Sequence, residues 1–462
     1  MAKKKAVKEE APQVSFTPDY ASILKGVERK FKLTSSSTDI AARRQTAIST
    51  GLLATDLIIG GGLLPGWSTA YGGEQSCKST FKQHVAISSV EHEVPLILDF
   101  DYEGSGDPQY FGTTLETMTM GRLNIDDIFG LYDGAGKVVK APRIRLYNET
   151  VGESFFDSMA SMLRQMPDKV FEDGEWFYVY ENTNENRKIV GSNYSKSKFS
   201  EWNKFYVPTG SSKPQAVLMV DSYPYMYPEM LDEDDKGAGL AAVARMFSSN
   251  IPKLAPKLKK KSVVVLGVNQ LRQRPAARGD PFYEPAGEAI RFASQLRIRS
   301  TSRAIPHGTG QIEEEDSATI EGGTDTYRYI VQRATKNKTG GMPLAEVWQR
   351  VWVSDAEGKA HGIDPVWDTY QFLKLTGQVE GSLKKLKFHI PGMPEKVQWW
   401  DFKALMLLTG KDLREHCESI GITKNPKIRE MCKKQLESGE AFTKYIETRQ
   451  GLGDDEGESE ED

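Results

Sequence analysis

The sequence predicts an α/β fold in which helices cover a twisted, mostly parallel β-sheet. Between residues 46 and 360, short β-branched runs alternate with helical stretches, a pattern typical of such a sheet. The chain has 462 residues, enough for one large core and one or two small domains. We therefore expect a core over residues 46–360, a short N-terminal helix and a small C-terminal domain.

The two ends of the chain differ from this core in composition. Residues 1–45 comprise a lysine-rich start, predicted to be disordered, and an amphipathic stretch from Tyr20 to Phe31. The apolar face of that short helix must pack either on its own core or on a neighbouring subunit. Residues 361–450 hold basic and aromatic clusters with helical stretches, and residues 451–462 form an acidic tail predicted to be disordered.

Five runs within the core are predicted to be strands of the main sheet. They are "STAYGG" (68–73), "VPLILDFD" (94–101), "AVLMVDS" (216–222), "SVVVLGVNQ" (262–270) and "QLRIRS" (295–300). The polar, aromatic-dotted segment 166–214 interrupts this order where a short connection is expected. It is interpreted as an inserted surface hairpin or loop, with a contact to a partner or to DNA as the alternative.

Composition excludes some classes of protein. No apolar run approaches the roughly 18 residues of a membrane span, so no membrane partner is expected. Three cysteines do not suit a disulfide framework, which indicates a reducing, cytoplasmic compartment. The net charge is −4, and without the seven acids of the last nine residues the chain carries 60 basic and 57 acidic residues. Any nucleic-acid site must therefore be a local basic stripe.

The stretch "YGGEQSCKSTF", from Tyr71 to Phe81, nearly matches a phosphate-binding loop. The pattern G-x-x-x-x-G-K-[ST] requires glycine where this chain has Cys77. In such a loop Lys78 would neutralise the β- and γ-phosphates of a nucleotide, and Ser79 would ligate Mg²⁺. A chance match is the alternative. A helix start beside Lys78 is also expected to lower the pKa of the Cys77 thiol and make it reactive.

Acids at the ends of two later strands favour the nucleotide interpretation. Asp221 ends the strand "AVLMVDS", where an acid can orient Mg²⁺ through water. Asp101 and Glu103 follow the strand "VPLILDFD", and a carboxylate there could polarise an attacking water. A helix cap after a core strand is the alternative role for Asp221, and acids at strand ends are common.

These motifs together resemble the RecA-type recombinase family. The resemblance runs in family order from about Tyr20 to Val379 and includes "GGEQSCKST", "DFDYEGSGDPQYF", "VDSYPYMYPE", "VNQLRQ" and "ATKNKTG". It implies a RecA-like P-loop ATPase core that uses ATP and Mg²⁺. The expected nucleotide-binding residues are Gly72, Gly73, Glu74, Gln75, Ser76, Cys77, Lys78, Ser79, Thr80, Asp107, Tyr110 and Asp221, with Ser79 and Asp221 at the metal.

The resemblance also assigns roles to individual residues. It implies that Glu103 activates water, that Gln270 senses the γ-phosphate, and that Asp107 and Tyr110 contact adenine. It also implies that Lys78 contributes to catalysis at the phosphate loop of its own subunit. Lys336 and Lys338 are the paired lysines that would reach the nucleotide of the neighbouring subunit.

A second loop after "VNQ" mixes arginine with aromatic residues, a pairing that suits single-stranded DNA. The alternative for this loop is an ordinary surface loop with solvated arginines. For Arg245 and Arg291, which flank it, the alternative is a plain surface salt bridge. The expected DNA-binding residues are Arg245, Arg272, Arg274, Arg278, Phe282, Tyr283 and Arg291. The acidic tail could occupy the DNA groove as a mimic or serve solubility.

The implied function is an ATPase that forms a helical filament on single-stranded DNA, pairs it with homologous duplex and exchanges strands. Single-strand-binding or mediator proteins are the expected partners besides DNA. The alternatives are a RecA-fold helicase motor or mediator, and a DNA-binding paralogue that does not hydrolyse ATP. Cys77, the insertion, and a second loop without the aliphatic residues of bacterial relatives indicate a divergent member of the kind that phages encode.

Overall fold

The computed structural model describes residues 40–454, with gaps. The gaps are residues 105, 120, 202, 230–238, 274–281, 286, 304–325, 343, 355–358, 381–386 and 390–426. The helix predicted between Tyr20 and Phe31 and the tail after Asp454 lie outside the described residues. Residues 451–454, expected to begin the disordered tail, instead form the last turn of α15 (Glu440–Asp454).

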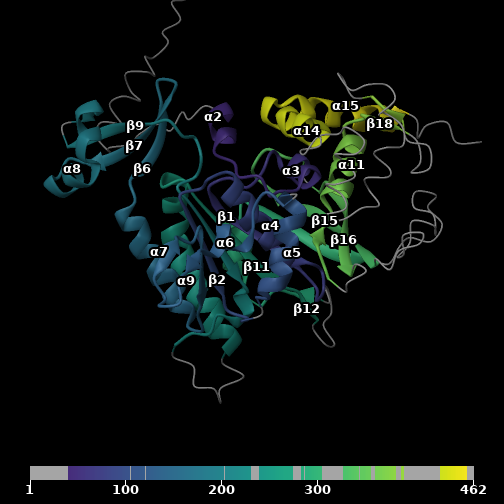
Figure 1. Cartoon of the computed structure of the whole chain (residues 1–462), viewed down its shortest axis with the longest axis horizontal. Coiled ribbons are helices and arrows are strands. Elements are labelled where there is room, and N and C mark those ends of the chain that lie inside the picture. Colours follow the sequence, from purple (N-terminus) through teal and green to yellow (C-terminus); the bar gives the residue numbers. More distant parts are fainter. Residues whose placement is uncertain are drawn as a thin grey trace, which may run out of the picture. The chain divides into compact units, whose positions relative to one another are not determined.

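A nine-stranded sheet forms the centre of the fold (Figure 1), in the order β17-β16-β15-β14-β1-β11-β10-β2-β5. The parallel strands are β1 (Gly66–Gly72), β2 (Leu96–Asp101), β5 (Ile144–Asn148), β10 (Ala216–Asp221), β11 (Val263–Gln270) and β14 (Leu296–Arg303). Three antiparallel strands follow β14: β15 (Thr326–Asn337), β16 (Glu346–Ser354) and β17 (Gly362–Ile363). The α/β class and all five predicted strands are confirmed, whereas β5 and the antiparallel strands were not predicted.

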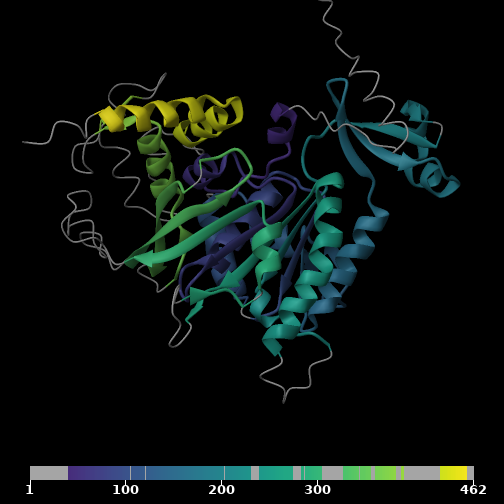
Figure 2. The same ribbon diagram turned by 180° about the vertical axis from the view of Figure 1, so that it is seen from behind.

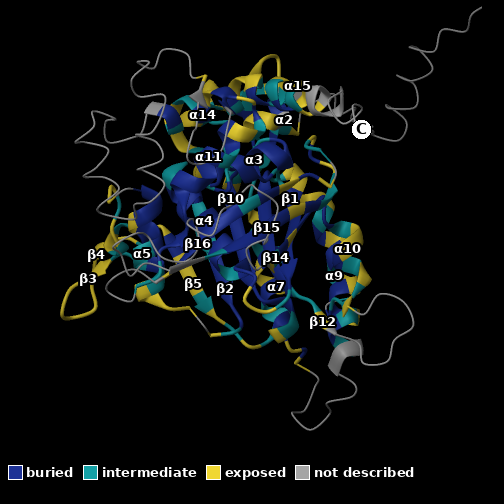
Figure 3. Ribbon diagram, turned by 90° about the vertical axis from the view of Figure 1, so that its right-hand side faces the viewer, coloured by how far each residue is buried: buried dark blue, intermediate teal, exposed yellow. Residues whose placement is uncertain are grey.

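Helices cover both faces of this sheet, because alternate side chains of its central strands point to opposite sides. On one face, Val217 and Val264 belong to a core cluster with Phe81 of α4 (Lys78–Glu91) and Leu115 of α5 (Pro108–Thr119). On the other, Leu218 packs in a cluster with α7 (Gly152–Gln165) and α9 (Gly239–Lys260). Figure 3 shows the buried strands between these layers.

The remaining elements are short. They include α2 (Ile40–Gln45), α3 (Leu53–Ile59), α6 (Ile125–Phe129), α10 (Glu288–Ala293) and the 3₁₀ turn Tyr223–Tyr225. Three two-stranded sheets pair β3 (Leu131–Tyr132) with β4 (Val138–Lys140), β12 (Arg272–Gln273) with β13 (Phe282–Tyr283), and β18 (Val379–Glu380) with β19 (Lys387–Phe388). Among the helices of the described residues, none is long and apolar enough to cross a membrane.

The inserted segment forms a small sheet of its own (Figure 2), and not the hairpin or loop expected from its polar sequence. The strands β6 (Asp168–Glu172), β7 (Glu175–Glu181), β9 (Lys204–Thr209) and β8 (Lys198–Glu201) pair antiparallel in that order. Helix α8 (Asn184–Val190) and the 3₁₀ turn Gly191–Lys196 connect β7 to β8. Phe205 is buried against the rings of Tyr180 and Tyr194, so aromatic contacts replace an extended core here.

The C-terminal helices pack on the main core, so the described part of residues 361–450 does not form the separate domain that we expected. Residues of α14 (Lys427–Ser438) and α15, among them Ile428 and Tyr445, belong to the same cluster as α4. The buried Asp368 of α11 (Pro365–Leu375) accepts hydrogen bonds from the backbone nitrogens of Leu53 and Ala54, at 2.6 and 3.1 Å. Residues 390–426 lie outside the described structure.

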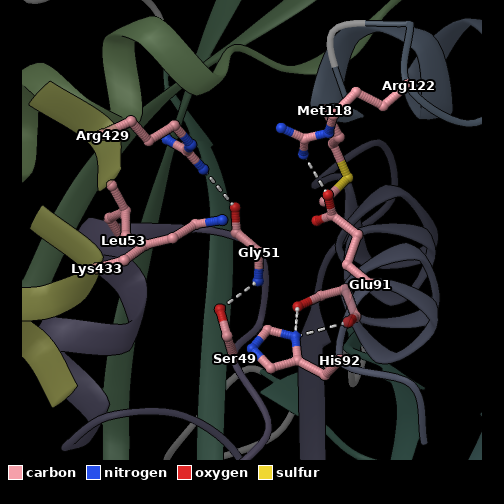
Figure 4. A pocket seen from close by; sticks show the side chains of 10 residues that line it. Ser49, Gly51, Leu53, Glu91, His92, Met118, Arg122, Arg429 and Lys433 are labelled. Atoms are coloured by element: carbon pink, nitrogen blue, oxygen red, sulfur yellow. Dashed lines mark hydrogen bonds and ion pairs between the residues drawn. The ribbon is translucent and has the colours of Figure 1, made fainter. Parts of the chain in front are cut away.

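A small polar pocket marks this junction (Figure 4). Arg429 of α14 donates to the carbonyl oxygen of Gly51 at 2.8 Å, and Lys433 and His92 line the space beside it. The pocket measures about 20 Å³, which leaves room for about one water molecule. It therefore belongs to the packing between α14 and the core.

Gly267 of β11 provides a test of the packing behind the sheet. A Cβ atom at this position would lie 1.7 Å from the Tyr223 hydroxyl, which accepts a hydrogen bond from the Trp67 indole at 2.7 Å. We expect Gly267→Ala to lower the free energy of unfolding by about 1–3 kcal/mol, because the buried Tyr223 ring must move. Denaturant unfolding measures this. Gly210→Ala is the control, since nothing lies within 4 Å of the added atom. Equal stability of the two variants would contradict the packing described.

Candidate nucleotide-binding site

The proposed site lies where the carboxyl ends of four parallel strands meet. Gly72 at the end of β1 pairs with Gln270 of β11, and Asp221 of β10 pairs with Asp101 of β2. Parallel strands end at the same edge of a sheet, and ligands of open α/β folds bind outside that edge. The phosphate-loop candidate therefore lies beside the acids and the glutamine that the sequence singled out.

The loop joins β1 to α4 over residues 73–77. A side chain at Gly72 would place its Cβ 2.2 Å from the carbonyl oxygen of Ser300, so only glycine fits there without rearrangement. Cys77 has φ of +59° and ψ of +32°, in the left-handed region. This is the position at which the pattern has glycine, and an L-residue there costs roughly 1–2 kcal/mol. The cysteine thus keeps the backbone conformation that glycine usually supplies.

Lys78 turns back on its own loop. Its ammonium donates to the carbonyl oxygen of Gly73 at 2.5 Å and to the Ser76 hydroxyl at 3.3 Å. Burial lowers the pKa of Lys78, while the nearby Asp221 and Glu103 act in the opposite direction. The ammonium is therefore held at the loop that would surround a phosphate, where a phosphate oxygen would be a stronger acceptor than a neutral carbonyl.

The Cys77 thiol is buried and accepts a hydrogen bond from Nη2 of Arg328 on β15 at 2.9 Å. Burial raises the pKa of Cys77, and the Arg328 and Lys78 charges only partly offset this. The expected lowering of that pKa is therefore wrong, because desolvation outweighs the effect of the neighbouring cations. The thiol is turned into the protein, toward β15.

The two candidate adenine contacts lie near the start of α5. The Tyr110 hydroxyl is 2.7 Å from the Thr80 hydroxyl in the first turn of α4, which ties α5 to the phosphate loop. Asp107 is exposed and accepts a hydrogen bond from the backbone nitrogen of Gln109 at 2.8 Å. A contact of either residue with adenine stays a prediction.

Glu103 is the junction of the site. Its Oε1 atom accepts hydrogen bonds from the Gln270 amide at 2.7 Å and from the Ser222 hydroxyl at 2.6 Å. The backbone nitrogen of Glu103 donates to the carboxylate of Asp101 at 3.1 Å, which also receives the nitrogens of Gly104 and Gly106. The predicted base and the predicted γ-phosphate sensor are thus in direct contact, and Asp101 shapes the turn that carries the base.

Asp221 fits the role of a carboxylate near a metal. It is 3% exposed, its Oδ2 atom lies 3.4 Å from Nζ of Lys82, and its buried Oδ1 atom has no hydrogen-bond partner among the described residues. A buried, unpaired carboxylate oxygen is costly unless a further group satisfies it. A water bound to Mg²⁺ would satisfy it, and Ser79, half-buried at the start of α4, could supply the second ligand.

The described DNA candidates flank the second loop. Arg272 of β12 is exposed and pairs in register with Tyr283 of β13, and Phe282 is 39% exposed. These residues form the base of the loop, whose predicted contacts Arg274 and Arg278 lie outside the described residues. Binding of DNA by this loop stays a prediction.

The two arginines on flanking helices differ in their surroundings. Arg245 is exposed on α9, whereas Arg291 forms an ion pair with Glu288 at 2.6 Å, the alternative that the sequence left open. Glu284 accepts a hydrogen bond from Asn269 at 3.0 Å and forms an ion pair with Arg297. Sequence reasoning missed this contact, which joins the end of the second loop to the residue before Gln270.

Lys336 and Lys338 do not reach the phosphate loop of their own chain. Lys336 pairs with Arg297 at the start of β14, whereas Gly72 pairs with Ser300 further along that strand. The ammonium of Lys336 donates to the carbonyl oxygens of Arg291 and Phe292 at 2.6 and 3.0 Å. Lys338 is exposed. A role for these lysines in a neighbouring subunit stays a prediction.

Three further residues of the site were missed by sequence reasoning: Ser222, Lys82 and Arg328. Lys82 had a signal, because it follows Lys78 by four residues and so lies on the same face of α4. Ser222 follows the predicted metal acid directly. Arg328 lies 251 residues after Cys77, and no local pattern indicates their contact.

Comparison with known proteins places these motifs in a family context. No protein-family model matches the chain. A mitochondrial DNA repair protein, the recA homolog of Dictyostelium discoideum, is 34% identical over 89 residues, 19% of this chain and 20% of that protein. Protein RecA of Symbiobacterium thermophilum is 24% identical over 250 residues, 52% of this chain and 59% of that protein.

These alignments therefore span between about one fifth and three fifths of the relatives' length. Among solved structures, the RadB recombinase matches with a TM-score of 0.37 and 15% sequence identity, over 68% of this chain and 98% of that one. The sequence relatives are RecA proteins and a recA homolog, and this chain is distantly similar to them over part of its length.

Proposed function

We propose that this protein is an ATP-dependent recombinase that forms a helical filament on single-stranded DNA. The observation that carries the proposal is the contact of Glu103 with Gln270 and Ser222, beside the loop that holds Lys78. The proposed base Glu103, the proposed sensor Gln270 and the proposed phosphate-binding cation Lys78 thus lie at one edge of the sheet. ATP hydrolysis needs these three roles together.

The geometry indicates how the residues would act on ATP. The loop nitrogens and the start of α4 would bind the phosphates, and Lys78 would exchange the Gly73 carbonyl for phosphate oxygens. Mg²⁺, held through Ser79 and Asp221, would neutralise charge on those oxygens. Glu103 would accept a proton from the water that attacks the γ-phosphorus, while the bond to the leaving ADP oxygen breaks.

A route from the nucleotide to DNA follows from the chain itself. Gln270 ends β11, and Arg272 begins the base of the second loop two residues later. On the other arm of that loop, Glu284 is bound to Asn269, the neighbour of Gln270. A γ-phosphate that draws Gln270 away from Glu103 would therefore shift both arms of the proposed DNA loop.

The remaining steps rest on the family likeness. Lys336 and Lys338 of one subunit would complete the site of the next, and the filament would pair its strand with homologous double-stranded DNA and exchange strands. Single-strand-binding or mediator proteins would assist, in the cytoplasm of a bacterial or phage-infected cell. ATPase assays with and without single-stranded DNA, with imaging of the same samples, test this proposal. DNA-stimulated hydrolysis with rings instead of filaments would favour a helicase motor or a mediator. DNA binding without hydrolysis would favour a paralogue that does not hydrolyse ATP.

Lys78→Ala tests the phosphate loop. Removing the ammonium should abolish nucleotide-dependent DNA binding, because no fixed positive charge then faces the β- and γ-phosphates. Fluorescence anisotropy of labelled single-stranded DNA, with and without ATP, measures this. Lys137→Ala removes a cation from an exposed turn and serves as the control. Undiminished ATP turnover in Lys78→Ala would show that the site lies elsewhere.

Glu103→Gln tests the base. The amide can still accept from Gln270 and Ser222 but cannot take a proton, so we expect hydrolysis to slow by roughly 10²–10⁴-fold with nucleotide binding retained. Steady-state turnover and nucleotide affinity, measured separately, distinguish the two effects. Glu116→Gln on the exposed face of α5 should behave as wild type. Wild-type turnover in Glu103→Gln would show that another residue is the base.

Cys77 tests whether the loop works without its glycine. Because burial raises the pKa of this thiol, iodoacetamide should label it more slowly at neutral pH than it labels a free thiol. Peptide mass spectrometry follows the reaction, and unfolded protein gives the unprotected rate. Cys77→Gly should retain ATP binding, since glycine adopts a φ of +59° without strain. Rapid labelling of the folded protein, or ATP binding that appears only in Cys77→Gly, would contradict this interpretation.

A further inference from the structure

Lys82 is a buried cation that the mechanism above does not use. It lies one helical turn after Lys78 on α4 and is 6% exposed. Its ammonium donates to the carboxylate of Asp99 at 3.0 Å and lies 3.4 Å from that of Asp221. A buried lysine destabilises the fold unless it is paired with an acid. Lys82 meets this requirement because it lies between two carboxylates.

The strand register explains why these groups meet. Asp99 and Asp101 are two residues apart on β2 and therefore point to the same face of the sheet. Asp221 of β10 pairs directly with Asp101, so its side chain shares that face, which α4 covers. Lys82 is the cation that α4 extends toward these acids.

The two carboxylate oxygens of Asp221 have different surroundings. Its Oδ2 atom faces Lys82, whereas its buried Oδ1 atom has no partner among the described residues. Asp99, in turn, draws Lys82 toward β2 at the shorter distance. A cation in contact with one oxygen of a carboxylate fixes its orientation and also opposes a second cation approaching the other oxygen.

We propose that Lys82 is a positioning residue that orients Asp221 and opposes the divalent cation there, with Asp99 controlling how strongly it does so. The inference rests on the proposed nucleotide site and adds a determinant of its metal affinity. The pair Asp99 and Lys82 then sets the Mg²⁺ concentration at which nucleotide binds. Without the Asp99 carboxylate, Lys82 would pair with Asp221 alone and oppose the metal more strongly. Without both Lys82 and Asp99, no cation would oppose a metal at Asp221.

Two variants should therefore move the Mg²⁺ dependence in opposite directions. Isothermal titration of ADP over a series of MgCl₂ concentrations gives the half-saturating Mg²⁺ concentration without relying on catalysis. We expect Asp99→Asn to raise this midpoint roughly three- to tenfold, and the double variant Lys82→Met with Asp99→Asn to lower it below the wild-type value. Asp99→Asn keeps Lys82 paired with Asp221, and the double variant removes one positive and one negative charge together. Circular dichroism of each variant in MgCl₂ checks that it is folded before the titration.

The control is a surface ion pair that likewise joins a lysine to a carboxylate. Lys213 and Glu93 lie 3.1 Å apart and are exposed, so Lys213→Met with Glu93→Gln changes the same charges far from the site and should leave the midpoint unchanged. A purely structural role for Lys82 would lower the melting temperature equally at every Mg²⁺ concentration. The proposal is overturned if the site variants keep the wild-type midpoint or both shift it in the same direction. Absence of ADP binding in the wild type would instead overturn the nucleotide site itself.

Discussion

The parallel register of β1, β11, β10 and β2 is the constraint on which the site depends. It places Gly72 beside Gln270 and Asp221 beside Asp101, so that the candidate phosphate loop, the proposed sensor Gln270 and the acids meet at one edge. A shift of one residue between β10 and β2 would turn the Asp221 side chain to the other face of the sheet. The carboxylate would then point toward the α7 and α9 layer and lose Lys82. The hydrogen bonds between these parallel strands thus determine which residues, far apart in the sequence, lie close together at the site.

Two of the buried acids, Asp56 and Asp221, differ in how completely their carboxylates are paired. Asp56 receives hydrogen bonds from Ser49 and from the backbone and hydroxyl of Thr50, and burial raises its pKa to about 7. Its partners lie within seven residues, which is typical of an acid that stabilises a turn. Asp221 is equally buried but has one oxygen paired and one without a partner among the described residues. That incomplete pairing, more than burial itself, is what supports the proposed metal-binding role of Asp221.

Sequence patterns predicted the central strands because strands buried on both faces form continuous apolar runs, as "AVLMV" and "VVVLGV" do. The antiparallel strands β15 and β16 contain charged residues such as Arg328 and Arg333 between apolar ones, and their pairing depends on chain segments far away. Single acids at strand ends indicated Glu103 and Asp221, since such positions follow directly from the strand pattern. The Cys77–Arg328 and Lys82–Asp99 contacts could not be predicted, because tertiary packing alone determines which distant side chains meet.

Cys77 shows how a loop can keep its backbone while losing its glycine. The cost of the left-handed conformation, roughly 1–2 kcal/mol, falls on a residue whose side chain is buried and hydrogen-bonded. Burial of the thiol and its contact with Arg328 act against that cost. Arg328 is also a cation near the first turn of α4, so a positive charge of β15 lies beside the candidate phosphate loop. The loop therefore has the left-handed backbone at residue 77 that glycine usually supplies, and the missing glycine does not by itself exclude a nucleotide.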